Sequence, residues 1–290
     1  MAIHLKSPCK VNLLLNILGK RPDGFHELET IMQPVSFYDE LHFELVGQSL
    51  QLICSEKNLP ADSRNLVHRA ASVFLAAARI NEGVKIHLEK RIPLAAGLGG
   101  GSGNAATTLR GLNLMFGSPF GQEKLSEIAA SLGSDINFFL QDQPGLATGR
   151  GENVVSLPDF AALKGRAFFL FHPGFGISTP WAYQNLARFP EALNGRPGRA
   201  QVLARLLESR DLKAAASGFY NSLEAPALDK YPILKSYQEF LTESGAYVSL
   251  MSGSGSTTFA ITETVAVAEE IADKFRARYG NHGWHAVVPI

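Results

Sequence analysis

The residues that most directly suggest chemistry are the glycines of the segment Pro93–Ala106, which reads PLAAGLGGGSGNAA. Five of the seven residues from Gly97 to Gly103 are glycine. Glycine adds no side chain to a core and loses more backbone entropy on folding than other residues, so packing does not explain this density. What glycine does supply is a positive φ and close approach of bare N–H groups to a ligand.

The elements predicted on either side of this loop would position it. Residues 84–92 alternate between apolar and polar side chains and predict a half-buried strand before the loop. Apolar residues recur at helical spacing from Ala105 to Leu112 and predict a helix after it. Unpaired N–H groups and the positive end of the helix dipole point the same way, so the loop is predicted to bind an anion such as phosphate. The alternative is a flexible surface linker, which is rarely flanked so closely by a strand and a helix.

Three known loop patterns can be compared with this segment. A Walker A loop ends in Gly-Lys-Ser/Thr, whereas the only Gly-Lys here is followed by Arg21. The Rossmann pattern is matched formally by Gly101-x-Gly103-x-x-Ala106, but its acidic residue should end a second strand, and Glu123 begins a predicted helix. The hydrolase pattern G-x-S-x-G occurs neither around Ser102 nor in residues 252–256. A different phosphate-binding pattern is therefore expected.

Composition limits the class of protein. The chain has 290 residues, of which 46% are hydrophobic and 19% charged, which is typical of a globular protein with a substantial core. The formal net charge is zero, so an anionic substrate must be bound by local groups, and neither nucleic acid nor membrane is expected as a partner. Cys9 and Cys54 form no disulfide framework or metal-binding pattern. We expect a cytoplasmic protein, as a monomer or homodimer.

The remaining patterns predict a mixed α+β chain in two lobes, with domains at 1–155 and 156–290. The expected elements beyond the loop are as follows: strands at 1–18, 41–46, 50–53, 167–171 and 258–262, and helices at 65–78, 122–132, 200–207, 234–244 and 265–278. A turn is expected at Gly19–Gly24 and a further short element at Asp135–Leu140.

The glycine segment fits the pattern Pro-x-x-x-Gly-Leu-Gly-Gly-[Gly/Ser]-Ser and resembles the ATP-binding loop of the GHMP kinase superfamily. Two further motifs of that superfamily have counterparts in the same order, at Ser7–Leu13 and at Met251–Ser256. The resemblance implies the two-lobed α+β GHMP kinase fold, with the active site in the cleft between the lobes. It also implies transfer of the γ-phosphoryl group of ATP to a small-molecule alcohol.

Within the superfamily, the segments Lys10–Leu13 and Gly19–Leu28 resemble the members that act on a cytidyl diphosphate substrate of non-mevalonate isoprenoid synthesis and phosphorylate its 2-hydroxyl. The likeness continues nearly end to end, through the segments Asn65–Val67, Lys90–Pro93, Leu132–Ile136 and His172–Gly174. The Asp-Gly-Phe-His element is the most discriminating, because it serves cytosine recognition.

The resemblance assigns the catalytic roles to Asp135, as the base for the attacking hydroxyl, and to Lys10, as its partner. An aspartate of this kind accepts the proton of the acceptor hydroxyl in phosphoryl transfer, and a nearby ammonium keeps it ionised. Without the resemblance, Asp135 reads as a plain helix N-cap and Lys10 as a solvated strand residue.

The resemblance also assigns the substrate site. Phe25 would stack on the cytosine, His26 would hydrogen-bond the base edge, and Asn12 would lie beside the substrate. The family pattern has tyrosine at position 25 and phenylalanine at position 183, whereas this chain has Phe25 and Tyr183. Both positions stay aromatic, so Tyr183 is expected to form the second face around the base. The alternatives are a core position for Phe25 and a structural histidine.

The ATP site would use Asn65 and Lys90 on the adenosine side and the loop around the triphosphate. The expected loop contacts are Pro93, Leu94, Ala95, Ala96, Gly97, Leu98, Gly99, Gly100, Gly101, Ser102, Gly103 and Asn104. No carboxylate cluster forms a protein-only Mg²⁺ site, which agrees with a metal bound by phosphate oxygens and water, with Ser102 nearby. Residues 253–256 either touch the substrate diphosphate or brace the glycine loop.

Two rival functions stay open at this point. One is another kinase of the superfamily, which would have no use for Asp-Gly-Phe-His. The other is a nucleotide-binding regulator that has lost catalysis, which would not need both Lys10 and Asp135.

Overall fold

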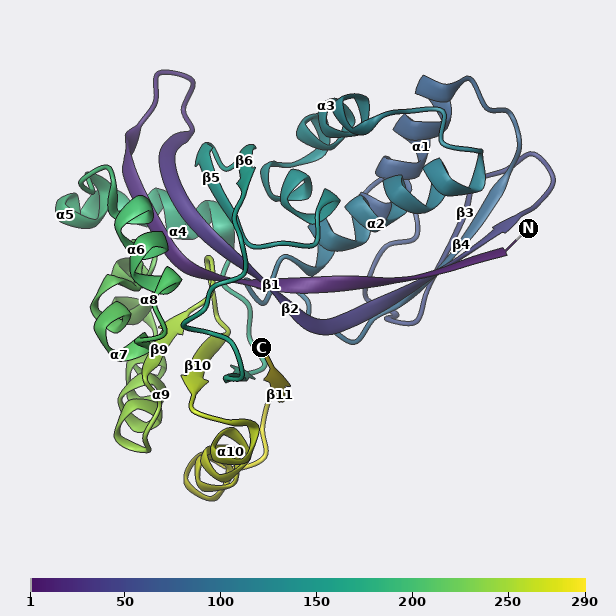
Figure 1. Ribbon diagram of the computed structural model, residues 1–290. Coiled ribbons are helices and arrows are strands. Elements are labelled where there is room, and N and C mark those ends of the chain that lie inside the picture. The colour runs from purple at the N-terminus through teal and green to yellow at the C-terminus, as the bar shows by residue number, and fades with distance from the viewer. Residues whose placement is uncertain (1) are drawn as a thin grey trace. The chain divides into compact units, whose positions relative to one another are not determined.

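The structure, a computed structural model, describes residues 2–290 (Figure 1). The chain divides into two compact units, each built from three segments. Unit 1 comprises the residues up to Cys9 together with Phe37–Ile92 and Gly99–Asp142, and unit 2 comprises Lys10–Ser36, Pro93–Leu98 and Gln143–Ile290. The long strands β1 (Ala2–Lys20) and β2 (His26–Leu45) therefore contribute residues to both units. The division of the chain into domains at residues 155 and 156 stays a prediction.

Unit 1 is a sheet covered on one face by helices (Figure 1). Its elements besides parts of β1 and β2 are β3 (Gln51–Cys54), α1 (Leu66–Ala78), β4 (Val84–Glu89), α2 (Gly100–Met115), α3 (Gln122–Leu132) and the 3₁₀ helix η1 (Ser134–Leu140). Strand β4 pairs antiparallel with the last residues of β2 and parallel with β3.

The two faces of this sheet differ in polarity, because successive side chains of a strand point to opposite faces. Leu41 and Phe43 of β2 are fully buried, and Phe43 meets α2 so closely that a Cβ on Gly111 would lie 2.7 Å from its ring. The alternate positions His42 and His87 pair across β2 and β4. These imidazoles lie on the face that the helices leave uncovered, which is therefore polar.

Unit 2 contains a four-stranded antiparallel sheet of order β11-β7-β10-β9. Besides parts of β1 and β2, the strands of unit 2 are β5 (Gly145–Gly149), β6 (Asn153–Ser156), β7 (Ala167–His172), β8 (Tyr220–Asn221), β9 (Val248–Met251), β10 (Thr258–Thr262) and β11 (Trp284–Pro289). Of these, β5, β6 and β8 belong to the sheet that contains β1 and β2. Its helices are α4 (Thr179–Asn185), η2 (Leu186–Arg188), α5 (Pro190–Leu193), α6 (Arg199–Glu208), α7 (Leu212–Ala215), η3 (Ala216–Gly218), α8 (Glu224–Lys230), α9 (Pro232–Glu243) and α10 (Val265–Tyr279).

Aromatic side chains form much of the core of unit 2. Phe171 of β7 packs on Phe275 of α10 and on Tyr237 of α9, with ring centroids 4.6 and 5.1 Å apart. Phe275 also contacts Phe240 and Tyr279. Offset and edge-on arrangements of this kind each add about 0.5–1.5 kcal/mol beyond the burial of area. The cluster attaches α9 and α10 to the sheet.

The structure confirms the mixed α+β class and each of the longer helices predicted from periodicity. The main difference is β2, which was expected only over residues 41–46 and begins at His26. Residues Leu28–Gln33 of β2 are buried without interruption, polar side chains included, so they lack the alternation that predicts a half-buried strand. No helix within residues 2–290 is long and apolar enough to span a membrane.

Candidate active site

The glycine segment crosses from unit 2 into unit 1 between Leu98 and Gly99, and α2 begins within it. Gly99 is the N-cap of α2 with φ 69°, and no side chain caps the helix. The first N–H groups of a helix have no intrahelical partner. An anion at the start of α2 would bind to these groups, and such binding stays a prediction. Ser102, in this first turn, is half-buried.

Two of the loop glycines are fixed by close backbone contacts, one in each unit. At Gly97, with φ 77°, a Cβ would lie 2.1 Å from the carbonyl oxygen of Ser252. At Gly103, a Cβ would lie 2.6 Å from the carbonyl oxygen of Pro8 in β1. No larger residue fits either place without a shift of backbone, so packing alone requires glycine at both positions.

In unit 1, a buried carboxylate that sequence reasoning missed organises the predicted ATP side. Asp39 is 0% exposed, and its Oδ1 accepts hydrogen bonds from the backbone N–H groups of Arg91 and Ile92 at 2.7 and 2.9 Å. Its Oδ2 accepts from Lys90 Nζ and, at 2.9 Å, from Asn104 Nδ2. Lys90 Nζ also donates to Asn104 Oδ1 at 3.3 Å. One carboxylate thus joins Lys90 to the first turns of α2.

Asn65 has a local structural task in unit 1. Its Oδ1 accepts from Val67 N at 2.9 Å and caps α1, while its Nδ2 donates to the Pro60 carbonyl at 2.8 Å. Such an N-cap contributes about 0.5–2 kcal/mol. A nucleotide contact at Asn65 stays a prediction.

Asp135 is the second residue of η1, whose N-cap is Gly133. The plain N-cap alternative for Asp135 therefore does not apply. Asp135 is half-buried and belongs to unit 1, whereas Lys10 belongs to unit 2. The pairing of these two residues in catalysis stays a prediction.

In unit 2, Lys10 is buried among oxygen acceptors. Its side chain is 3% exposed, which excludes the solvated alternative. Its Nζ donates to Asn12 Oδ1 and, at 3.0 Å, to the Gly97 carbonyl. Asn12 Nδ2 donates in turn to Thr30 Oγ1 at 2.9 Å. The structure thus brings two predicted site residues, Lys10 and Asn12, together with the start of the glycine loop.

The second small-residue loop, residues 252–256, contacts this same group in unit 2. Ser252 Oγ donates to the Gly97 carbonyl at 2.9 Å, and Thr257 N donates to the Ala96 carbonyl at 3.2 Å. Asn221 Nδ2 supports the loop through the carbonyls of Met251 and Gly253, both at 2.8 Å. These contacts brace the glycine loop through Ser252 and Thr257, the two residues that flank 253–256, and the role of residues 253–256 stays a prediction.

The predicted base-binding residues form two separate ring contacts within unit 2. The rings of His26 and Tyr183 lie 5.0 Å apart at 39°. Phe25 is 54% exposed, which excludes a core position, and the guanidinium of Arg150 lies 4.8 Å from its ring centroid. Partial burial and the neighbouring Lys20 lower the pKa of His26, which favours the neutral imidazole. Arg150 is a further candidate residue that the sequence pattern did not single out.

A half-buried glutamate that supports the second loop gives a testable pH dependence. Glu224 Oε1 accepts from Gln238 Nε2 and from Met251 N, at 2.5 and 2.7 Å. Burial raises the pKa of Glu224 to about 7. Between this value and the ordinary pKa near 4.5, the folded chain binds more protons than the unfolded chain, so its free energy of unfolding falls as pH rises.

Glu224→Gln retains an oxygen acceptor without the charge. Relative to the wild type, the variant is expected to gain about 3 kcal/mol of unfolding free energy at pH 8 and nothing at pH 4. Urea denaturation at both pH values measures this difference. The control is Glu239→Gln, which changes an exposed carboxylate of α9 that pairs with Lys235. This variant should show no such pH dependence. Equal effects of the two changes would contradict the assignment to Glu224.

Comparison with known sequences defines the class of protein. The family described as "GHMP kinases N terminal domain" matches residues 65–149, and "GHMP kinases C terminal" matches residues 203–281. A solved mevalonate kinase from L. major, 16% identical, has the same fold, with a TM-score of 0.73 over 99% of this chain and 97% of that one. The protein is an ATP-dependent phosphotransferase of the GHMP kinase fold.

Nearer relatives carry a more particular name. A protein of Synechococcus sp. (strain JA-3-3Ab) named 4-diphosphocytidyl-2-C-methyl-D-erythritol kinase is 43% identical over 94% of this chain and 89% of its own length. One of that name from Geobacter sulfurreducens is 37% identical over 95% of each chain. The crystal structure of a 4-(cytidine 5'-diphospho)-2C-methyl-D-erythritol kinase is 33% identical in sequence and superposes with a TM-score of 0.80. The match covers 99% of this chain and 100% of that one. The chain belongs to the family of 4-diphosphocytidyl-2-C-methyl-D-erythritol kinases.

Proposed function

We propose that the protein transfers the γ-phosphoryl group of ATP to the 2-hydroxyl of 4-diphosphocytidyl-2-C-methyl-D-erythritol, in the non-mevalonate isoprenoid pathway. The observation that carries this proposal is the name shared by relatives that match nearly the whole chain at 35–43% identity. The Asp23-Gly24-Phe25-His26 element supports the cytidyl part of the substrate, because cytosine recognition needs a hydrogen-bonding group beside aromatic rings.

In this mechanism Asp135 accepts the proton of the attacking hydroxyl, and Lys10 stabilises the carboxylate and the developing negative charge. Phosphoryl transfer depends mostly on positioning and charge stabilisation, which suits an ammonium whose orientation is already fixed. The contacts of Lys10 Nζ with Asn12 and with the Gly97 carbonyl support such a fixed orientation. Asn12 then lies beside the acceptor substrate.

Residues Pro93–Asn104 surround the triphosphate in the proposed complex, with Lys90 and Asn65 on the adenosine side. The loop offers backbone N–H groups and the hydroxyl of Ser102 but no carboxylate. This donor set suits Mg²⁺ that arrives with ATP and is bound mainly by phosphate oxygens and water. The chain's own contribution to the ion is then the Ser102 hydroxyl.

A coupled assay of ADP release tests the substrate. With Mg²⁺ and ATP present, ADP should form when the cytidyl diphosphate substrate is added and not when mevalonate, homoserine or galactose replaces it. Turnover of one of those three in place of the cytidyl substrate would assign the chain to another activity of the superfamily. No turnover with any of the four would favour a nucleotide-binding regulator.

The proposed base-binding wall gives a prediction for Tyr183, whose ring meets His26. Loss of one stacking ring costs about 1–3 kcal/mol, so Tyr183→Ala should raise the KM for the cytidyl substrate about 5- to 150-fold while the KM for ATP stays unchanged. Steady-state kinetics with each substrate varied measures both values. Tyr183→Phe retains the ring and should remain close to wild type. An unchanged KM for the cytidyl substrate in Tyr183→Ala would exclude Tyr183 from this wall.

A further inference from the structure

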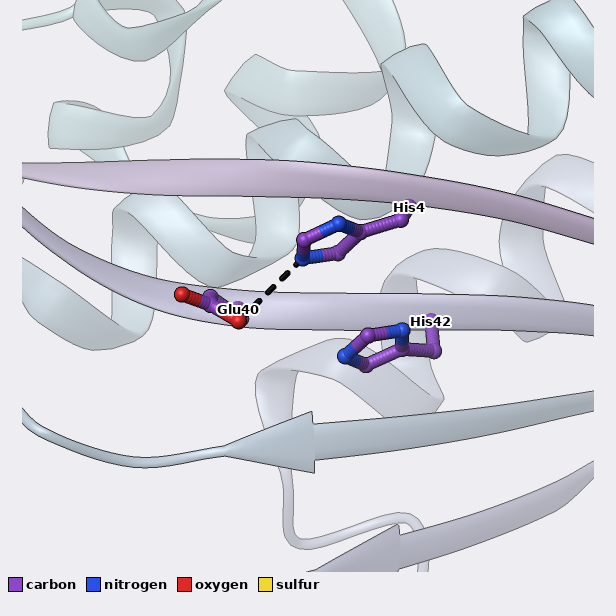
Figure 2. Close-up of side chains that lie close together, drawn as sticks. All are labelled: His4, Glu40 and His42. Carbon is purple, nitrogen blue, oxygen red and sulfur yellow. Dashed lines mark ion pairs between the residues drawn. The ribbon is translucent and has the colours of Figure 1, made fainter.

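A cluster of metal-binding side chains lies in unit 1 on the sheet face that the helices leave uncovered. His4 comes from β1, and Glu40 and His42 come from β2, two residues apart and therefore on the same face of that strand. Figure 2 shows the three side chains together, with the dashed line marking the ion pair between His4 and Glu40. None of them takes part in the proposed kinase reaction.

We propose that His4, Glu40 and His42 form a binding site for a divalent transition-metal ion of the zinc type. One donor atom from each residue lies within 4.8 Å of the other two. His4 Nε2 and Glu40 Oε2 are 3.2 Å apart. Donors bound to one tetrahedral Zn²⁺ at about 2.0–2.1 Å lie about 3.4 Å from each other. The separation of this pair is thus close to that of two ligands of one ion, and His42 is the ligand that must reorient to join them.

The chemistry of the donors selects the ion. Two imidazoles and one carboxylate are a zinc donor set that leaves a fourth position to water, whereas Mg²⁺ prefers oxygen ligands alone. The rings of His4 and His42 are stacked in parallel, with centroids 4.2 Å apart. The donor lone pairs of parallel rings do not converge, so one ring must turn out of the stack for both imidazoles to bind one ion.

The neighbours of the cluster leave one carboxylate oxygen to the ion. Arg91 binds Glu40 through the other oxygen, Oε1, at 3.0 Å, and also pairs with Glu89 at 3.1 Å. These contacts orient the carboxylate, as hydrogen bonds to metal-binding groups commonly do. Beside His42 the surface forms an open depression of about 480 Å³, lined by His42, Glu44, Ile53, Lys85, His87 and Glu89. An ion and its water ligand can enter from this side.

Titration of Zn²⁺ into the purified full chain by calorimetry, without nucleotide, tests the proposal. A single equivalent is expected to bind. His4→Ala and His42→Ala should each weaken binding about 10- to 100-fold, because removal of a ligand costs at least as much as removal of a group that orients one. Glu40→Gln should also weaken it, and Mg²⁺ should not compete at equal concentration. Kinase turnover with MgATP should be unchanged in His4→Ala and His42→Ala.

Two further histidines serve as controls. His282→Ala changes an exposed histidine of unit 2, and His87→Ala changes the cross-strand neighbour of His42, whose ring centroid is 6.0 Å away. Both should bind Zn²⁺ as the wild type does, with unchanged circular dichroism in all variants. Absence of stoichiometric binding, or equal affinity in wild type, His4→Ala and His42→Ala, would overturn the proposal. A loss in His87→Ala as large as that in His42→Ala would overturn the assigned ligands.

Discussion

Asp135→Asn is expected to lower kcat about 10²- to 10⁴-fold while ATP binds with unchanged affinity, because asparagine cannot accept the proton of the attacking hydroxyl. Single-turnover kinetics measures the chemical step, and calorimetry with a non-hydrolysable ATP analogue measures binding. The expectation rests on the proposed role of Asp135 as the catalytic base. Asp135 lies inside η1, after the N-cap Gly133.

The control for this change is Asp142→Asn. Asp142 is an aspartate of unit 1 whose side chain is 75% exposed and pairs with Arg110 on the surface. The Asp142→Asn variant should turn over substrate at the wild-type rate. An exposed ion pair contributes about 0–1 kcal/mol to stability, and this one takes no part in the reaction. Full activity in Asp135→Asn would exclude Asp135 as the base. Loss of ATP binding together with activity would instead assign Asp135 to the nucleotide site.

The second large effect is expected at Asp39. Asp39→Ala removes the carboxylate that accepts from Lys90, Asn104 and two backbone N–H groups, and it leaves the Lys90 ammonium buried without its counter-ion. Breaking a buried ion pair from one side costs about 3–5 kcal/mol of unfolding free energy. Guanidinium denaturation measures this loss, and the KM for ATP should rise in the same variant.

Two companion variants separate the possible causes. Glu44 lies on β2, as Asp39 does, and forms an exposed ion pair with Lys85 of the neighbouring strand β4. Glu44→Ala breaks this pair and should cost less than about 1 kcal/mol. Adding Lys90→Met to Asp39→Ala removes the unpaired charge and should recover part of the lost stability, although not the affinity for ATP. A cost below 1 kcal/mol for Asp39→Ala alone would mean that this network does not stabilise unit 1.

The sequence predicts the parts of the site that depend on local patterns. Glycine density and helical spacing locate the start of α2, because positive φ and a 3.6-residue period both produce patterns that are visible within a few residues of sequence. The role of Asp39 produces no such local pattern. Its partners Lys90 and Asn104 are 51 and 65 residues away along the chain, and a carboxylate in a strand is ordinarily a surface residue. Only the folded chain shows that it is buried.

The sequence predicts which residues could bind the base, but it does not predict which of their side chains contact one another. Phe25, His26 and Tyr183 were all expected around one base, and the structure pairs His26 with Tyr183 and Phe25 with Arg150. Residue types indicate which side chains suit a nucleobase, but the partner of each ring depends on the paths of separate segments. The burial of Lys10 was likewise unpredictable, because a lysine between Cys9 and Val11 fits either face of a strand.

The composition of unit 2 from distant segments has a consequence for synthesis on the ribosome. The second half of β1 leaves the ribosome early, yet Leu14 and Leu15 pair with β8, and Ile17 N donates to Ser222 Oγ, 205 residues later. At about 5–20 residues per second, this partner follows roughly 10–40 seconds after β1. The segments of unit 1 are complete once Asp142 has emerged. A nascent chain can therefore complete its first unit before β8, the partner of Leu14 and Leu15 in the second unit, has been synthesised.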